Sequence, residues 1–312
     1  MVEVEENVKL VRAKPFVVVG IPAFNEERSI ARVVLEAQQY ADAVIVCDDG
    51  SDDLTAEIAE KLGAEVIRHE KRLGYGTAIQ SMFKRARELD ADVFVTLDGD
   101  GQHDPCEIPN MVKPIVEGAA DVVIGSRLVD KRQAYSMPWY RRAGVKFITW
   151  LVNNSGKYSL KDAQSGFRAY NRESLEKLSL TENGMGASIE ILVNADKEGL
   201  RIMEVPASCN YGKNVEKSTH NPVKHGVSVV MSLVRLVVEE RPLMFLGVPG
   251  IISLFLGVFF GAWMLKIYAL ERHIATNIAL ASIAFILIGL FAIFTAVTLY
   301  AISRLTQKIN KK

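Results

Sequence analysis

Residues 16–53 read FVVVGIPAFNEERSIARVVLEAQQYADAVIVCDDGSDD. A β-branched run is followed by a helical pattern and then by a second β-branched run, which is the order of a strand–helix–strand unit. The alternation continues to residue 126, and we expect five strands in it: FVVVG, AVIVC, EVIRH, DVFVTL and ADVVIGS. The sequence therefore predicts an α/β domain built on a mainly parallel sheet that is flanked by helices.

Composition excludes some classes of protein. The 312 residues include 37 Lys and Arg and 37 Asp and Glu, so the formal net charge is zero and we expect no nucleic-acid partner. The three cysteines, Cys47, Cys106 and Cys209, form no C-x-x-C pair, and we expect them to be small buried hydrophobic residues in a reducing compartment. The start, MVEVEENVKLVRAK, is charged and unlike a secretory signal, so a cytoplasmic N-terminal domain is expected.

Two stretches near the C-terminus, residues 243–265 and 278–302, carry no charged side chain. About 20 apolar residues cross a bilayer as a helix, whereas buried core helices, the alternative, usually keep a polar face. We expect a domain over residues 1–220, an amphipathic interfacial helix over 221–241, and two spans with a basic tail over 242–312. Basic residues of the outer flanks place both termini in the cytoplasm: Lys224, Arg235, Arg241, Arg304, Lys308, Lys311 and Lys312.

Polar loops follow four of the predicted strands: IPAFNEE, CDDGSDD, HEKRLGYG and DGDGQHD. Ligands of parallel sheets bind beyond the carboxyl ends of the strands, so we expect all four loops at one edge. In DGDGQHD, the alternating oxygen donors Asp98, Asp100 and Gln102 suit a hard cation, Mg²⁺ or Mn²⁺, that is shared with substrate phosphates. An EF-hand loop is excluded, because its sixth and twelfth positions hold His103 and Pro109. A solvated turn is the other alternative.

Three of these loops offer groups that suit a nucleotide. The backbone of IPAFNEE can flank a base while a glutamate reaches the ribose. The carboxylates that directly follow AVIVC can accept hydrogen bonds from the base or from the ribose. The cations of HEKRLGYG either meet a diphosphate or are plain surface charges. The candidates for nucleotide contacts are Pro22, Ala23, Phe24, Glu26, Asp48, Asp49, Lys71, Arg72 and Asp98.

Together these motifs resemble the family 2 glycosyltransferases with the GT-A fold, in which PAFNEE, DDGSDDLT and a D-x-D-x-Q follow in this order. GSR at 125–127, DAQSGFRAY at 162–170 and the two C-terminal spans are similar to polyprenyl-phosphate sugar synthases, such as dolichyl-phosphate mannose or glucose synthase. The resemblance covers residues 16 to about 218 by motif. In YGKNVEKST, Lys213 stands where the family commonly has Arg.

The resemblance implies an inverting transfer of one hexose from a nucleotide sugar, of the GDP-mannose or UDP-glucose type, to dolichyl or polyprenyl phosphate at the cytoplasmic membrane face. A lipid phosphate has a second pKa of about 6, so no strong general base is required. The alternatives are a processive polysaccharide synthase, which would need a Q-x-x-R-W motif that the chain lacks, and a non-catalytic lipid carrier or assembly protein, which the intact D-x-D-x-Q disfavours. The expected catalytic residues are Asp100, Arg127, Gln164 and Ser165.

Cations are expected to hold the acceptor phosphate, because guanidinium grips phosphate bidentately. The candidates are Arg127, Arg141, Arg142 and Lys217. Residues 137–154 mix aromatic with basic side chains, which is typical of a helix in the lipid interface, although an amphipathic core helix has a similar composition. The role of Glu190 and the oligomeric state, a homo-oligomer included, stay open.

Overall fold

A computed structural model describes residues 14–130, 137–155, 158–210 and 243–309 of the chain. The chain divides into two compact units, Met1–Ser232 and Leu233–Lys312. The predicted interfacial helix over 221–241 and the predicted domain boundaries on either side of it lie outside the described residues.

Seven strands of the first unit form one sheet in the order β3-β2-β1-β4-β6-β5-β7. β1 pairs in parallel with β2 and β4, β2 with β3, and β5 with β7, so the predicted mainly parallel sheet is confirmed. The carboxyl ends of β1 to β4 meet at one edge, and the four polar loops leave from there. The strands are β1 (Val17–Ala23), β2 (Ala43–Asp48), β3 (Glu65–Arg68), β4 (Val93–Thr96), β5 (Val122–Ser126), β6 (Arg168–Asn171) and β7 (Ile202–Pro206).

Strand β6 lies antiparallel between β4 and β5, an insertion that the sequence pattern did not predict. In its register Thr96 is opposite Arg168. Because β6 runs backwards, the chain that enters it arrives beside the chain that leaves β4. The DAQSGF stretch, residues 162–167, is therefore brought to the same edge of the sheet as residues 98–102 (DGDGQ), here named the acidic loop.

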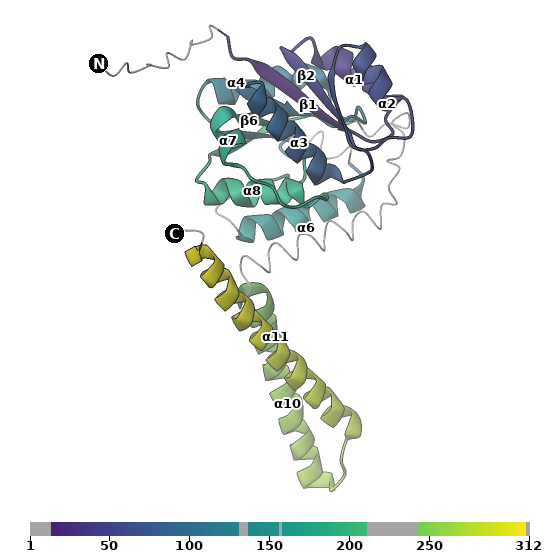
Figure 1. Ribbon diagram of the computed structural model, residues 1–312. Helices are drawn as coiled ribbons and strands as arrows, with labels where there is room; N and C mark the ends of the chain where they lie inside the picture. The colour runs from purple at the N-terminus through teal and green to yellow at the C-terminus, as the bar shows by residue number, and fades with distance from the viewer. Residues whose placement is uncertain (1–13, 131–136, 156–157, 211–242, 310–312) are drawn as a thin grey trace, which may run out of the picture. The chain divides into compact units, whose positions relative to one another are not determined.

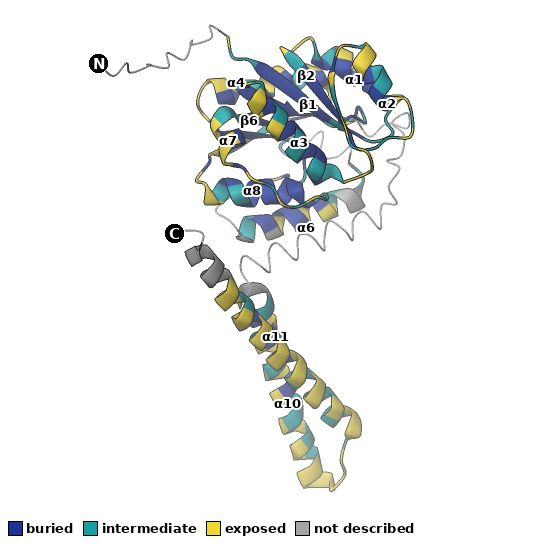
Figure 2. Cartoon of the chain, viewed as in Figure 1, coloured by how far each residue is buried: buried dark blue, intermediate teal, exposed yellow. Residues whose placement is uncertain are grey.

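Apolar cores cover both faces of the sheet (Figures 1 and 2). Along β1 the side chains alternate: Val19 packs with Val33 of α1 on one face, and Val18 packs with Met82 of α3 on the other. Burial on both faces is expected of a strand in a parallel sheet. The helices are α1 (Ile30–Ala37), α2 (Thr55–Lys61), α3 (Tyr75–Glu88), α4 (Ile108–Val116), α6 (Trp139–Ser155), α7 (Arg172–Lys177) and α8 (Ala187–Lys197), and the 3₁₀ turn η1 (Pro105–Glu107) precedes α4.

The second unit is a pair of long apolar helices, α10 (Val248–Glu271) and α11 (Thr276–Ile309), preceded by a π-helical turn over Leu243–Gly247. Val248–Glu271 and Thr276–Ile302 have the length and hydropathy to cross a membrane, and only 11% of each apolar window is buried. Large side chains such as Phe255 and Phe294 are 71% and 72% exposed, and most of both helices is exposed in Figure 2. Core helices would bury these residues, so the pair suggests membrane anchoring.

Small residues let α10 and α11 approach closely. A Cβ added to Gly257 would lie 2.8 Å from the amide nitrogen of Ile286, and one added to Gly289 would lie 2.7 Å from the carbonyl oxygen of Gly250. The Ser282 hydroxyl also donates to the carbonyl oxygen of Gly257 at 2.7 Å. Close backbone approach and hydroxyl bonds of this kind hold membrane helices together, so the two helices pack as one hairpin.

Candidate active site

The loop after β4 carries the predicted cation ligands and is tightly folded. The Asp100 carboxylate accepts the amide N–H of Gln102 at 2.9 Å, which closes a turn. Gly101 has φ of +69°, a conformation that favours glycine, and its carbonyl oxygen accepts Nη2 of Arg32 on α1 at 2.9 Å. The loop is therefore held in place from the α1 side.

Four carboxylates act on one another at this edge. Burial raises the pKa of Glu26 to about 7 against an opposing hydrogen bond from Ser29, and the negative charges of Asp100, Asp53 and Asp98 raise it further. Burial also raises the pKa of Asp98. Clustered oxygen donors that repel each other suit a hard divalent cation, which would offset their charge.

The stretch that enters β6 forms a wall against Asp98. A Cβ added to Gly166 would lie 2.6 Å from Oδ1 of Asp98, so a larger residue here would displace the Asp98 carboxylate. The Thr96 hydroxyl donates to the Gly166 carbonyl oxygen at 2.7 Å and fixes the approach from β4. Gly166 thus lies against the acidic loop. Gln164 and Ser165 belong to the same stretch of chain, which enters β6.

Arg168 builds this wall, although the sequence did not single it out. The side chain is 1% exposed and donates to three carbonyl oxygens: Nε to Ser165 at 2.8 Å, Nη2 to Ala163 at 2.8 Å, and Nη1 to Ser188 at 2.7 Å. Its positive charge also opposes the burial that raises the pKa of Asp98. The sequence feature that could have identified Arg168 is its position as a charged residue between apolar neighbours in GFRAY.

Arg127, the predicted phosphate-binding cation at the end of β5, is held by Asp162. Its Nε and Nη2 donate to the two carboxylate oxygens of Asp162 at 2.6 and 2.9 Å. Asp162 is fully buried and Arg127 is 18% exposed. Burial would raise the pKa of Asp162, but the charge and hydrogen bonds of Arg127 lower it overall. The guanidinium is therefore fixed at the edge, and its charge also acts on Asp98.

His103 follows the acidic loop and is 3% exposed. Burial lowers the pKa of its imidazole, and the positive charge of Arg127 lowers it further. Nδ1 lies 3.0 Å from the carbonyl oxygen of Ser208, so it donates the proton there. The imidazole is neutral at pH 7 and acts as a structural link.

The predicted nucleotide loops are joined to one another. The Arg72 guanidinium lies over the Phe24 ring at 4.0 Å from its centroid, which links HEKRLGYG with IPAFNEE. The amide of Asp49 donates to the carbonyl oxygen of Ala23 at 2.9 Å, and the amide of Asn25 donates to the Ser51 hydroxyl at 2.9 Å. Lys71 is exposed and Pro22 is partly buried. These loops form one surface, as predicted.

Both carboxylates at the end of β2 have hydrogen bonds within the protein. Asp48 accepts from the Ser51 hydroxyl. Asp49 accepts the amides of Leu73 and Gly74, each at 2.8 Å, and its Oδ1 lies 2.8 Å from Nδ1 of His69. Asp49 therefore fixes the loop that carries Lys71 and Arg72, a role that sequence spacing did not reveal.

The remaining predicted residues are partly buried, are bonded within the protein, or lie outside the described part of the chain. Arg142 is partly buried on α6, and Gln164 is partly buried beside Asp162. Glu190 accepts the amides of Thr181 and Glu182 at 2.9 Å, so its role is to fix that loop. The side chain of Arg141 and all of Lys213 and Lys217 lie outside the described residues.

The prediction that all three cysteines are buried is wrong. Cys47 is buried, but Cys106 is exposed and Cys209 is partly exposed. Cys106 lies on the short η1 turn and Cys209 lies in the stretch after β7, where no helical or strand periodicity directs a side chain into a core.

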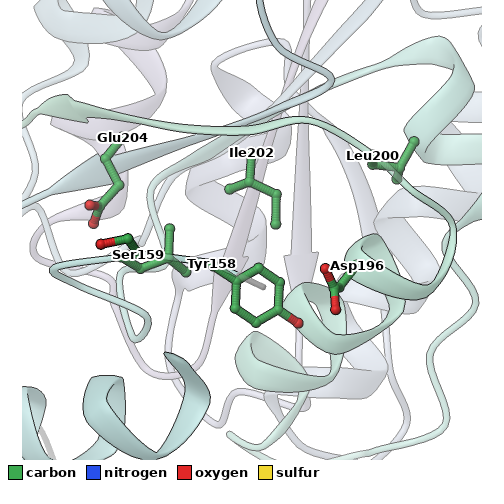
Figure 3. Close-up of a pocket in the computed structure, with 7 residues that line it drawn as sticks. Tyr158, Ser159, Asp196, Leu200, Ile202 and Glu204 are labelled. Carbon is green, nitrogen blue, oxygen red and sulfur yellow. The ribbon is translucent and has the colours of Figure 1, made fainter. Parts of the chain in front are cut away.

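A pocket of about 280 Å³ lies at a different place, between α8, β7 and residues 158–160 (Figure 3). Its polar lining includes Asp196 and Glu204, and the Glu204 carboxylate accepts the amides of Lys161 and Asp162, each at 2.8 Å. The predicted site residues do not line this pocket. Within the described part of the chain, its lining contains no Lys or Arg side chain that could bind a phosphate ligand.

A family model described as Glycosyl transferase family 2 matches residues 18–179, just over half of the 312-residue chain. The chain belongs to glycosyl transferase family 2. The match spans IPAFNEE, CDDGSDD, the acidic loop and the wall before β6, which are the parts that converge at the edge of the sheet.

Several relatives of this family 2 enzyme act on dolichyl phosphate according to their names. It is 35% identical to a dolichyl-phosphate hexose transferase of Haloferax volcanii, over 70% of this chain and 92% of that one. It is 36% identical to a UDP-N-acetylglucosamine–dolichyl-phosphate N-acetylglucosaminyltransferase of Methanococcus voltae, over 61% of this chain and 84% of that one. The chain is thus a glycosyltransferase of the dolichyl-phosphate hexosyltransferase type.

Solved structures share the fold of the family 2 enzyme. Glucosyl-3-phosphoglycerate synthase from Mycobacterium tuberculosis, in complex with Mn²⁺, uridine diphosphate and phosphoglyceric acid, has a TM-score of 0.54 at 23% identity, covering 72% of this chain and 79% of that one. The likeness confirms the predicted GT-A-like α/β fold of the first unit. The neighbouring enzyme binds Mn²⁺.

The oxygen donors of the family 2 enzyme fit a divalent cation. Among the residues that the structure describes, no three His, Cys, Asp or Glu side chains come close enough to form a metal site by themselves. A site with few protein ligands is typical of Mg²⁺ that is shared with substrate phosphates. The ligand set Asp98, Asp100 and Gln102 stays a prediction.

We expect Glu26→Gln to flatten the pH dependence of stability of the family 2 enzyme. A carboxyl with its pKa raised from 4.5 to about 7 keeps a proton in the folded state that the unfolded chain has already released. Stability is therefore lost as pH rises from about 4.5 to 7. The glutamine variant should gain stability relative to the wild type across this window, measured by thermal unfolding in detergent and chelator. An unchanged difference between pH 4.5 and 8 would contradict this.

Proposed function

We propose that this family 2 enzyme transfers one hexose, with inversion, from a nucleotide sugar to dolichyl or polyprenyl phosphate at the cytoplasmic face of a membrane. The observation that carries the proposal is the convergence of carboxylates and a fixed guanidinium at one edge of the sheet. Asp98 and Asp100 supply oxygen donors, and Arg127 is held beside them by Asp162. The names of the Haloferax and Methanococcus relatives support the acceptor.

The donor would lie along the edge formed by the loops after β1 to β4. Phe24 and Arg72 offer a flat face and a charge for the nucleotide, and Asp49 fixes the loop that carries Arg72. Asp98, Asp100 and Gln102 would hold a divalent cation at the diphosphate. Such a cation offsets the negative charge that develops on the leaving diphosphate.

The acceptor phosphate would meet Arg127. Its guanidinium is partly exposed and fixed in orientation by two hydrogen bonds to Asp162, so little side-chain entropy is lost on binding. A phosphate dianion attacks the sugar without losing a proton first, because its second pKa is about 6. A transfer that needs no general base agrees with the environment of His103, whose imidazole is neutral and donates through Nδ1 to a carbonyl oxygen.

Two parts of the chain suit a bilayer. The hairpin of α10 and α11 would anchor the enzyme, and the basic flanks favour cytoplasmic termini. On α6, Val145 and Val152 are buried, whereas Phe147 and Trp150 are 53% and 56% exposed and stack at 6.3 Å between ring centroids. An exposed aromatic pair next to the exposed Lys146 suits the headgroup region.

A transfer assay tests the proposal. The full chain in detergent is incubated with Mg²⁺ or Mn²⁺, a short polyprenyl phosphate and one radiolabelled nucleotide sugar at a time, from a panel of UDP- and GDP-sugars. We expect one donor to yield a polyprenyl-phosphate monosaccharide, with the unphosphorylated polyprenol as an inactive control. A polymeric product would favour the processive synthase instead, and no lipid-linked product with any donor would contradict the proposal.

A further inference from the structure

The chain leaves β7 directly across the acidic loop. Residues 207–210, which follow β7, are here named the exit segment. The amide of Ala207 donates to the Ser126 carbonyl oxygen at 3.1 Å, which extends the pairing of β7 with β5 by one residue. After that residue the exit segment departs from the sheet and bonds to residues 102–107.

Four contacts fix the exit segment there. The amide of Ser208 donates to both carboxylate oxygens of Glu107, at 3.1 and 2.9 Å, and the Ser208 carbonyl oxygen accepts Nδ1 of His103 at 3.0 Å. The amide of Asn210 donates to the carbonyl oxygen of Gln102 at 2.8 Å. The Cys209 thiol lies 3.7 Å from the side-chain oxygen of Gln102.

The acidic loop is consequently held from two sides. On one side α1 bonds to it, through Ser29 to the Gly99 carbonyl oxygen at 2.8 Å and through Arg32 to Gly101. On the other side the exit segment contacts both the main chain and the side chain of Gln102. A shift of the exit segment would move the Gln102 amide oxygen directly.

Glu107 is the side chain that ties the exit segment down most firmly. It stands at the N-cap position of α4, yet its side chain makes no capping hydrogen bond. Both of its carboxylate oxygens point instead to the Ser208 amide, which lies 101 positions away in the sequence. A hydrogen bond to a carboxylate is stronger than one between neutral groups. The acid therefore contributes to long-range positioning and does not cap its own helix.

We propose that Glu107 is a positioning residue for cation binding. It holds the exit segment against residues 102 and 103, and so sets where the Gln102 side-chain oxygen lies, without touching the cation. This rests on the proposed function, in which Gln102 helps to hold a divalent cation. Cys209 acts in the same contact by supporting the Gln102 oxygen.

The test measures Mn²⁺ binding to the full chain in detergent by electron paramagnetic resonance, with no substrate present. We expect Glu107→Ala to weaken Mn²⁺ affinity about three- to tenfold, because one charge-assisted hydrogen bond is lost. Glu107→Gln keeps an acceptor and should restore most of the affinity. The matched control is Glu117→Ala, just after α4, which removes an exposed ion pair with Lys113 and should bind Mn²⁺ like the wild type.

A second readout follows the exit segment itself. Mass spectrometry gives the rate at which the partly exposed Cys209 is alkylated in each variant, relative to its rate in the wild type at the same pH. We expect Glu107→Ala to raise the Cys209 rate severalfold, and Glu107→Gln to return it toward the wild-type rate. If Glu107→Ala does not fold by circular dichroism, Cys209→Ala replaces it, with an expected two- to fivefold loss of Mn²⁺ affinity for one weak hydrogen bond.

Asp100→Ala distinguishes a failure of the proposed cation site from a failure of the positioning role of Glu107. Wild-type Mn²⁺ affinity in Asp100→Ala would overturn the proposed cation site. Lost affinity in Asp100→Ala together with wild-type affinity in Glu107→Ala, or in Cys209→Ala where that variant replaces it, would overturn the positioning role alone. Unchanged alkylation of Cys209 in Glu107→Ala would also overturn it, because the exit segment would then be held without Glu107.

Discussion

Asp100→Ala is expected to lower the rate of sugar transfer by about a thousandfold or more. A metal ion that polarises a phosphoryl oxygen stabilises the transition state by several kcal/mol, and each 1.36 kcal/mol is a factor of about ten. Asp100 lies at the centre of the acidic loop and its charge already acts on Glu26. Excess chelator should abolish wild-type transfer in the same way. The measurement is the radiolabelled transfer assay, with circular dichroism to confirm the fold.

Asp104→Ala is the matched control for Asp100, because it removes a carboxylate four positions away. Asp104 is exposed and caps the η1 turn by accepting the amide of Cys106 at 3.0 Å. Its loss should cost about 1 kcal/mol of stability and leave transfer close to the wild-type rate. Full transfer by Asp100→Ala, or by the wild type in excess chelator, would show that no cation acts at this loop.

Arg127→Ala is expected to have the second largest effect, on both stability and acceptor use. Asp162 is fully buried and has both of its carboxylate oxygens bonded to Arg127. Removing one partner of a buried pair leaves an uncompensated charge, which costs about 3–5 kcal/mol. The KM for polyprenyl phosphate should rise much more than the dissociation constant of the nucleotide, which calorimetry measures.

A double variant separates these two effects of Arg127. Arg127→Met with Asp162→Leu removes both charges, and apolar replacement of a buried pair is often neutral in stability. We expect it to recover the stability that Arg127→Ala loses, but not the use of polyprenyl phosphate. Recovery of transfer in the double variant would mean that Arg127 serves only the fold. Lys177→Ala, which removes an exposed ion pair with Glu173, is the surface control and should leave stability close to that of the wild type.

Periodicity in the sequence was sufficient for the strands β1 to β5, but it did not predict β7, which pairs in parallel with β5. β1, β2, β4 and β5 are runs of mainly buried β-branched and apolar residues, and helical patterns separate them along the sequence. β6 was missed because its four residues, RAYN, include a charge and an amide. β6 is placed by tertiary pairing with β4 and β5. Arg168 is buried because three carbonyl oxygens accept its hydrogen bonds, those of Ala163 and Ser165 shortly before it and that of Ser188 on α8. Residue type alone does not show that these backbone groups turn toward the side chain.

The location of the candidate site was also predictable from the sequence, but the hydrogen bonds of its side chains were not. Strand ends locate the polar loops, since parallel strands share an edge, and the convergence of the loops at that edge is confirmed. The hydrogen-bond partners of each acid were not predictable. Asp49 bonds to amides 24 and 25 positions away, and Glu107 bonds to one 101 positions away. Residue type and spacing do not tell a carboxylate that fixes a loop from one that meets a ligand.

The antiparallel strand β6 also has a consequence for synthesis of the chain on the ribosome. Thr96 and Arg168 are opposite each other across 72 positions, which take about 4–14 s to translate at typical rates. Throughout that interval β4, with the sequence VFVT, keeps one edge unpaired and open to other chains. When β6 arrives, it covers that edge and brings Gly166 against Asp98 in the same step. The open edge of β4 is thus closed at the moment when Gly166 comes to lie against Asp98.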